Sequence, residues 1–256
     1  MRQAGLVVGR TLQLLRTTVR PGTTTAQLDA LAEQHIRDSG ATPSFLGYHG
    51  FPATICTSVN EQVVHGIPGP TALRDGDVVS IDCGAIVDGW HGDAAITVAV
   101  GDVPPATRRL LEVCEEAMWR GLAAARLGGR VTDISAAVER YTRSQGGYGI
   151  VEDYVGHGIG SAMHQPPSVP NYGRAGRGPR LVAGLALAVE PMLTLGSKHT
   201  TVLADGWTVV TVDGSWSAHF EHTFTLTDRG TWVLTALDGG ATEMSALGVP
   251  CAEPVH

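Results

Sequence analysis

Two apolar runs rich in β-branched residues, VVSIDCGAIV and WHGDAAITVAV, meet at the dipeptide Asp88-Gly89. Asp-Gly between two such runs predicts a β-hairpin with a two-residue turn, because both turn residues need a positive φ. A turn at this place pairs Asp82 with Ala95. Because side chains alternate between the faces of a strand, Asp93 then shares a face with Asp82. Two carboxylates on one face between apolar strands would repel each other and lose hydration, so the pattern indicates a bound metal ion.

Helical spacing of apolar residues predicts a pair of helices in each half of the chain, over residues 3–18, 24–39, 104–127 and 132–146. Thr24 and Gln27 form a capping-box pattern at the start of the second of these helices. Thr132 is the expected N-cap of the fourth. Each helix pair leads into a region of strand patterns.

Strands and turns follow each helix pair, so the order of elements is repeated. Residues 54–64 are predicted to form one strand before the hairpin, and the loop PSFLGYHGFP before them is expected to shape a pocket. The repetition predicts an α+β fold of two helix-helix-sheet units, about residues 1–103 and 104–238, related by a pseudo-two-fold axis around a central antiparallel sheet. We expect residues 239–256 to form a loosely packed C-terminal tail.

Composition restricts the classes of function. At 256 residues the chain can bury a substantial core, and its length fits one catalytic domain over residues 1–238 or two fused half-domains. Its 18 basic and 25 acidic side chains give a formal charge of −7, and no basic stripe favours nucleic acid as a ligand. Four widely spaced cysteines without a CxxC motif indicate a reducing, cytoplasmic location. No apolar run approaches about 20 residues, so we expect a soluble protein.

Three further candidate ligands lie in the second half of the chain. His157 is in the glycine-rich motif GHGIG, Glu190 ends the apolar run LVAGLALAV, and Glu221 follows a second Asp-Gly turn that we expect to close another hairpin. Four carboxylates and one imidazole carry too much negative charge for one divalent ion. Two metal ions about 3.5–4 Å apart, bridged by carboxylates and a hydroxide, would balance that charge.

Each of these residues also has an ordinary structural interpretation. An aspartate in a hairpin is usually a turn or edge residue, and a strand glutamate usually faces solvent. A histidine beside glycines usually makes a structural hydrogen bond. The residues by themselves therefore leave both interpretations open, although five such side chains together favour the metal site.

A series of motifs spans about residues 1–235: PGTTTAQLD, GYHGFPATICTSVNEQVVHGIP, SIDCGAIVDGWHGDAA, GHGIGSAMHQPP, VEPM and DGWTVVTVDGSWSAHFEHT. In order and spacing the series resembles the type I methionine aminopeptidases. The resemblance implies the pita-bread fold, in agreement with the repeated order of elements. It also implies a hydrolase that removes the initiator methionine from nascent proteins when the second residue is small, through a hydroxide activated by two metal ions.

The resemblance implies a complete set of metal ligands: Asp82, Asp93, His157, Glu190 and Glu221. In this set Asp93 and Glu221 are expected to bridge two divalent ions, which would be Co, Mn, Fe(II) or Zn. The resemblance also implies a monovalent cation near three residues of the central region: Asn60, Gln62 and Ser217.

The same resemblance assigns catalytic roles to three residues. His65 would contact the substrate amide, His164 would stabilise the oxyanion, and Glu190 would act as the general base. The methionine pocket would be lined by Tyr48, Phe51, Cys56, Met163 and Trp207, with His49 near the entrance. Aromatic and sulfur-containing residues are also ordinary core residues, which is the alternative for each.

Several positions depart from the commoner family pattern. Phe51 replaces tyrosine, Met163 replaces phenylalanine, Val64 replaces cysteine, and Gln165-Pro166 replaces an acidic pair. We expect these changes to tune the shape of the pocket without abolishing the chemistry.

Two rival functions fit the sequence less well. Proline-directed peptidases of the same fold, prolidase and aminopeptidase P, usually carry an extra amino-terminal domain, for which this chain has no room. Non-catalytic members of the fold typically lose metal ligands, which are all present here. Two features favour type I over type II: no amino-terminal zinc-finger extension precedes the first helix, and Glu190 and Glu221 are only 31 residues apart. The expected partners are nascent N-termini beginning with Met and, transiently, the ribosome, with no nucleic-acid specificity, no membrane and a monomeric state.

Overall fold

The computed structural model describes residues 1–252. Its helices are α1 (Arg2–Thr18), α2 (Thr25–Asp38), the 3-10 turn η1 (Tyr48–Gly50), α3 (Pro105–Ala124), α4 (Val131–Gln145) and α5 (Ala241–Ala246). Its strands are β1 (Thr42–Pro43), β2 (Ile55–Val59), β3 (Gln62–Val64), β4 (Val78–Val87), β5 (Trp90–Ala99), β6 (Gly149–Ile150), β7 (Gly156–Gly158), β8 (Gln165–Val169), β9 (Ala186–Val189), β10 (Met192–Thr194), β11 (Thr200–Val202), β12 (Val209–Thr211), β13 (Ser217–His219), β14 (Glu221–Thr227) and β15 (Gly230–Val233).

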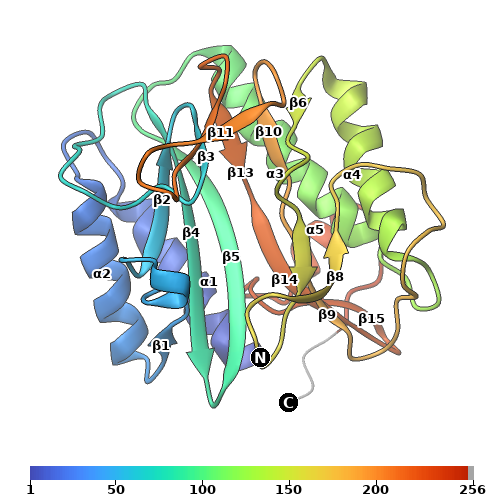
Figure 1. Cartoon of the computed structure of the whole chain (residues 1–256). Helices are drawn as coiled ribbons and strands as arrows, with labels where there is room; N and C mark the ends of the chain where they lie inside the picture. Colours follow the sequence, from blue (N-terminus) through green and yellow to red (C-terminus); the bar gives the residue numbers. More distant parts are fainter. Residues whose placement is uncertain (253–256) are drawn as a thin grey trace.

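A central antiparallel sheet organises the molecule. Its strands run in the order β1-β4-β5-β14-β9-β7-β8, with β2 beside β4 and β15 beside β14. Figure 1 shows β4, β5 and β14 together at the centre, with α1 and α2 on the side of the first half of the chain and α3 and α4 on the side of the second. The predicted α+β order, two helices followed by strands in each half, is present. Among the described helices, none has the length and apolar character of a membrane span.

The predicted hairpin is confirmed. Asp88 and Gly89 form its turn with φ values of 50° and 79°, and Asp82 pairs with Ala95. Asp93 therefore lies on the same face as Asp82, as the pairing predicted. This hairpin brings two of the predicted ligands to the middle of the sheet.

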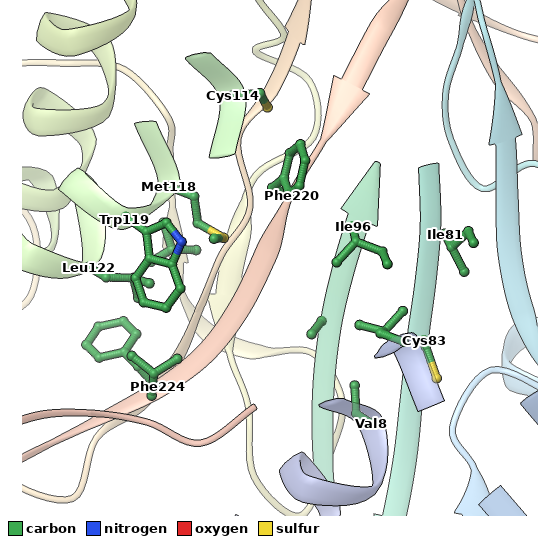
Figure 2. Close-up of a cluster of buried hydrophobic side chains, with 14 of the residues drawn as sticks. Val8, Ile81, Cys83, Ile96, Cys114, Met118, Trp119, Leu122, Phe220 and Phe224 are labelled. Atoms are coloured by element: carbon green, nitrogen blue, oxygen red, sulfur yellow. The ribbon is translucent and has the colours of Figure 1, made fainter. Parts of the chain in front are cut away.

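The main core lies between the helices and one face of the sheet. Figure 2 shows its side chains from α1, β4, β5, α3 and the region of β14: Val8, Ile81, Cys83, Ile96, Cys114, Met118, Trp119, Leu122, Phe220 and Phe224. Ile81 and Cys83 flank Asp82 in β4, and alternation of side chains turns Asp82 toward the opposite face. The sheet thus separates an apolar, helix-covered side from a side that carries carboxylates.

The N-termini of the predicted helices are partly as expected. The capping box of α2 is present, because Thr24 Oγ1 accepts a hydrogen bond from Gln27 N and Gln27 Oε1 accepts one from Thr24 N. The prediction that Thr132 caps α4 is wrong. Thr132 lies inside the helix and its hydroxyl donates to the carbonyl oxygen of Arg177, whereas Asp133 Oδ2 accepts from the backbone N–H of Arg130, 2.7 Å away.

Two strand predictions also differ from the structure. Residues 54–64 form two strands in different sheets, because Asn60 has a φ of 55° and turns the chain between β2 and β3. Asp213-Gly214 does form a turn, but it closes no hairpin. The strands on either side of it belong to separate sheets, β12 with β11 and β3, and β13 with β10 and β6.

The C-terminal segment is more ordered than expected. Helix α5 covers Ala241–Ala246, and Met244 within it is fully buried against the main core. Ala252 N donates to the carbonyl oxygen of Thr231, which ties the segment to β15. The prediction of a loosely packed tail is wrong for residues 239–252, and its last four positions, 253–256, lie outside the described residues.

Candidate metal centre and adjoining pocket

The strand register places predicted ligands in one row across the face of the sheet that points away from the helices. Glu221 of β14 pairs with Ala95 of β5, and Ala95 pairs with Asp82 of β4. Strand β9 ends one residue before Glu190, and its register with β14 places Glu190 level with Glu221. Carboxyl groups from three different strand regions therefore converge.

Asp93, His157 and Glu221 form the closest part of the set. One ligand atom of each lies within 4.8 Å of those of the other two, and all three side chains are buried. The carboxyl group of Asp82 adjoins that of Asp93, and Glu190 Oε1 lies 3.5 Å from His157 Nε2. The structure thus brings all five predicted ligands together.

Burial opposes the charged form of every member of this cluster. It raises the pKa of Asp82 to about 7. It raises the pKa of Asp93, Glu190 and Glu221 well above the ordinary range, and neighbouring carboxylates raise them further. Burial also lowers the pKa of His157 to about 4. Without metal, burial thus disfavours the charged forms of both His157 and Glu190, although their 3.5 Å contact has the geometry of an ion pair.

The cluster has the features of a cation site. Within residues 1–252, Asp82 Oδ1, Asp93 Oδ1 and Glu221 Oε1 are buried without a hydrogen-bond partner. No described residue that lines the surrounding cavity is a lysine or arginine that could neutralise them. Hard oxygen ligands with one imidazole are the donors that divalent ions of the Mn, Fe and Co type accept. The residues present therefore fit divalent metal ions.

An apolar cavity of about 120 Å³ adjoins the carboxylate cluster. Its apolar walls form a small hydrophobic cluster separate from the main core: Phe45, Tyr48, Phe51, Cys56, Met163 and Trp207. The rings of Phe51 and Trp207 meet edge to face, with centroids 5.1 Å apart. All five residues predicted for the pocket walls line this cavity, and Phe45 was not among the predicted residues.

Two predicted catalytic histidines line the same cavity. His65 follows β3 with a φ of 59°, a strained conformation for a non-glycine residue, and burial lowers its pKa to about 4. His164 packs against His157, with ring centroids 4.4 Å apart, and its Nδ1 lies 2.8 Å from the Tyr48 hydroxyl. His49 does not line the cavity. Its exposed ring meets the edge of Tyr48, with centroids 4.3 Å apart.

One residue near the cluster was missed from the sequence. His219 is fully buried, and its Nε2 lies 3.8 Å from Glu190 Oε2 without a hydrogen-bond partner in residues 1–252. Burial lowers its pKa to about 3. The signal was a histidine two positions before Glu221 in the motif AHFEHT. The alternation of side chains along the strand of Glu221 could not place His219, because His219 belongs to β13, which lies in another sheet.

Three of the departures from the family pattern fall in two places. Phe51 and Met163 line the cavity, so the shapes of these two side chains help to determine which substrate side chain the cavity can hold. Val64 is buried in a separate cluster with Val63, Val151, Met192 and Val209, so its contact with the cavity is indirect.

The fold and site define a class. Residues 1–228 match metallopeptidase family M24. A crystal structure of methionine aminopeptidase from Rickettsia prowazekii superposes with a TM-score of 0.90 at 43% identity, over 92% of this chain and 95% of that one. A prolidase from Pyrococcus furiosus superposes with a TM-score of 0.73 at 20% identity, over 92% of this chain and 62% of that one, and shows the shared fold. The protein is a metallopeptidase with the pita-bread fold, which confirms the predicted fold class.

Sequence relatives narrow the class. Methionine aminopeptidase 1 from Mycobacterium tuberculosis is 54% identical over 244 residues, which cover 92% of this chain and 91% of that protein. Methionine aminopeptidase from Clostridium acetobutylicum is 52% identical over 236 residues, which cover 92% of this chain and 94% of that protein. The chain belongs to the methionine aminopeptidases of family M24, and the identification as type I is confirmed.

Proposed function

We propose that this enzyme removes the initiator methionine from nascent chains whose second residue is small, with two divalent ions held by the carboxylate cluster. One observation carries the proposal: five side chains suited to metal lie at one end of an apolar cavity walled by aromatic and sulfur-containing residues. A cavity of about 120 Å³ admits a single side chain, so the reacting bond would lie beside the residue that occupies it. This arrangement supports cleavage after one terminal residue.

The five ligands have distinct proposed positions. Asp93 and Glu221 lie between the other carboxylates and suit bridging roles, whereas Asp82 would hold one ion and Glu190, with His157, the other. Bound divalent ions of this kind polarise a peptide carbonyl and lower the pKa of water. Asp82 and Asp93 come from the first half of the chain and the other three from the second, so the proposed catalytic domain, residues 1–238, acts as one unit.

The remaining steps belong to side chains of the cavity. Glu190 is the proposed general base, and burial, which raises its pKa, makes its carboxylate a stronger proton acceptor. His164 would donate a hydrogen bond to the carbonyl oxygen as negative charge develops there. His65 would contact the amide nitrogen of the same bond.

The shape and lining of the cavity favour methionine. The ring edges of Phe51 and Trp207 and the sulfur atoms of Cys56 and Met163 are soft, polarizable partners for a thioether. An unbranched side chain can also follow a narrow cavity that a β- or γ-branched one cannot. A second residue with a large side chain would collide with the rim, where Tyr48 is half-buried.

Further partners are part of the proposal. A monovalent cation near Ser217 is supported by three oxygen atoms that lie close together: Ser217 Oγ is 2.9 Å from the carbonyl oxygen of Gln62 and 3.5 Å from that of Asn60.

We also propose that the enzyme acts in the cytoplasm as a monomer that associates transiently with the ribosome. Three buried free cysteines support a reducing compartment: Cys56, Cys83 and Cys114.

The proposal is tested by metal reconstitution. Protein stripped with a chelator should release no methionine from Met-Ala-Ser, and Mn, Co, Fe(II) or Zn should restore release, with the most effective ion identifying the preferred metal. Met-Trp-Ser should be cleaved far more slowly than Met-Ala-Ser. Equal cleavage of the two peptides, or cleavage of Gly-Pro in place of either, would refute the proposed specificity and favour a proline-directed peptidase.

A further inference from the structure

The loop that contains Tyr48, in the first half of the chain, contacts His164 of the second half. Tyr48 begins the turn η1, which Gly47 and His49 shape with φ values of 84° and 48°. The Tyr48 hydroxyl lies 2.8 Å from His164 Nδ1, and the two rings are tilted by 50° with centroids 5.4 Å apart. This contact joins residues 116 positions apart in the chain.

The neighbouring histidine has a different partner at the same ring atom. His157 Nδ1 lies 2.9 Å from the carbonyl oxygen of Gly158. A carbonyl oxygen only accepts, so Nδ1 of His157 carries the hydrogen and Nε2 presents its lone pair toward Glu190 Oε1, 3.5 Å away. That tautomer is the one required of a metal ligand.

For His164 the partner at Nδ1 is a phenol, which is a good hydrogen donor. If the hydroxyl donates, Nδ1 is the unprotonated nitrogen and Nε2 keeps the hydrogen, since a neutral imidazole has one N–H. Nε2 is then the nitrogen that remains for a substrate oxygen, because no described residue hydrogen-bonds to it. Two histidines packed 4.4 Å apart would thus hold opposite tautomers, each set by its partner at Nδ1.

We propose that Tyr48 is a positioning residue, whose hydroxyl donates to His164 Nδ1 and holds the ring with its Nε2–H available to the carbonyl oxygen of the scissile bond. The inference rests on the proposed function, because it concerns the residue that would stabilise the oxyanion. It adds a polar role to a side chain that was expected only to shape an apolar pocket. The opposite arrangement, with Nδ1–H donating to the phenol, would leave Nε2 unable to donate to a carbonyl oxygen.

The test uses Tyr48→Phe, which keeps the ring and removes the hydroxyl. In the zinc-loaded enzyme labelled with ¹⁵N-histidine, the His164 resonance, identified by its loss in His164→Ala, should report Nε2–H in the wild type and a mixture of tautomers in Tyr48→Phe. With Met-Ala-Ser, kcat should fall about three- to tenfold with KM within twofold of wild type. This loss is smaller than the roughly 100-fold loss expected for His164→Ala, because the donor remains and only its orientation is lost.

Two further variants make the result specific. Incorporation of 4-aminophenylalanine at position 48 supplies an N–H donor at the same place and should restore most of kcat. Tyr141→Phe, in α4, removes the hydroxyl of a tyrosine that does not line the cavity and should change neither kcat nor the His164 resonance.

The proposal is overturned if His164 is the Nδ1–H tautomer in the wild type, or if Tyr48→Phe keeps full kcat. A rise in KM with unchanged kcat would also overturn it, because that result limits Tyr48 to binding the side chain. Failure of the proposed function is a separate result: a wild-type enzyme that does not release methionine would still show, in its ¹⁵N spectrum, whether Tyr48 sets the tautomer.

Discussion

After the metal ions are removed, the free energy of unfolding of this protein should fall as the pH rises above 6.5. Burial raises the pKa of Asp82 from 3.8 to about 7, and those of Asp93, Glu190 and Glu221 well above their ordinary values. A carboxyl group whose pKa is raised by folding stabilises the folded state below its unfolded pKa, and this stability is lost as pH rises through the folded pKa. The metal-free cluster is therefore a source of instability at neutral and alkaline pH.

Buried histidines act in the opposite direction, but at lower pH. Burial lowers the pKa of His65, His157 and His222 from 6.5 to about 4, and that of His219 to about 3. Their contribution is present above pH 6.5 and is lost as pH falls toward 4. Between pH 6.5 and 8 the folded histidines are neutral and the unfolded ones lose their last half proton, which adds about 0.4 kcal/mol of stability for each histidine. We expect the loss from the four carboxyl groups together to exceed this gain.

The size of the effect follows from the same linkage. Between pH 6.5 and 8, Asp82 alone lowers the free energy of unfolding by about 1 kcal/mol. The raised pKa values of Asp93, Glu190 and Glu221 act in the same direction. Each kcal/mol of lost stability corresponds to a fall in Tm of about 2–4 °C for a chain of this size. The ions, which bind the deprotonated ligands, should reverse this trend.

The assay is calorimetry of chelator-treated and metal-loaded protein at pH 6.5, 7.2 and 8.0. Metal-free Asp82→Asn, which cannot ionise at that position, should be more stable than the metal-free wild type at pH 8, whereas Asp102→Asn, at an exposed position, should not differ from it. A metal-free wild type whose Tm stays constant or rises from pH 6.5 to 8 would refute the reasoning.

Three further outcomes are expected. Asp82→Ala should lose bound metal by elemental analysis and release no methionine from Met-Ala-Ser, and full turnover by this variant would exclude the proposed site. The wild type should cleave Met-Ala-Ser and its norleucine analogue much faster than Leu-Ala-Ser, because Phe51 and Met163 leave a narrow cavity; equal rates for leucine and methionine would contradict this. Gly92→Ala should lower the urea midpoint by the equivalent of about 1–3 kcal/mol without changing the slope, because a Cβ at this position would lie 2.7 Å from the backbone nitrogen of Gly5 in α1, which cannot move aside.

The hairpin shows how far local sequence rules reach. The Asp88-Gly89 turn and the alternation of its strands were sufficient to place Asp82 and Asp93 on one face, because a two-residue turn sets the register of both strands. The capping box of α2 was predictable for the same reason, since each of the two side chains, Thr24 and Gln27, hydrogen-bonds to the backbone N–H of the other residue. Interactions between near neighbours in the chain depend little on the rest of the molecule.

Predictions failed where distant parts of the chain decide the outcome. Residues 54–64 have the composition of one strand, but β2 pairs with β4 and β3 pairs with β12, so the chain turns at Asn60. The segment after Gly239 is rich in small residues and contains two prolines, yet Met244 is buried because it packs against the main core. In both cases the partner surface is formed by residues far away in sequence.

By itself the sequence determined the fold class, the helix pairs, the register of the central hairpin and, through the order of its motifs, the family and its five candidate ligands. Only the tertiary structure decided that these ligands meet within one buried cluster, that His219 adjoins Glu190, and that Tyr48 reaches His164. The reason is that local patterns specify dihedral angles and the face of each strand, whereas a distance between side chains 116 residues apart depends on how both halves pack around one sheet.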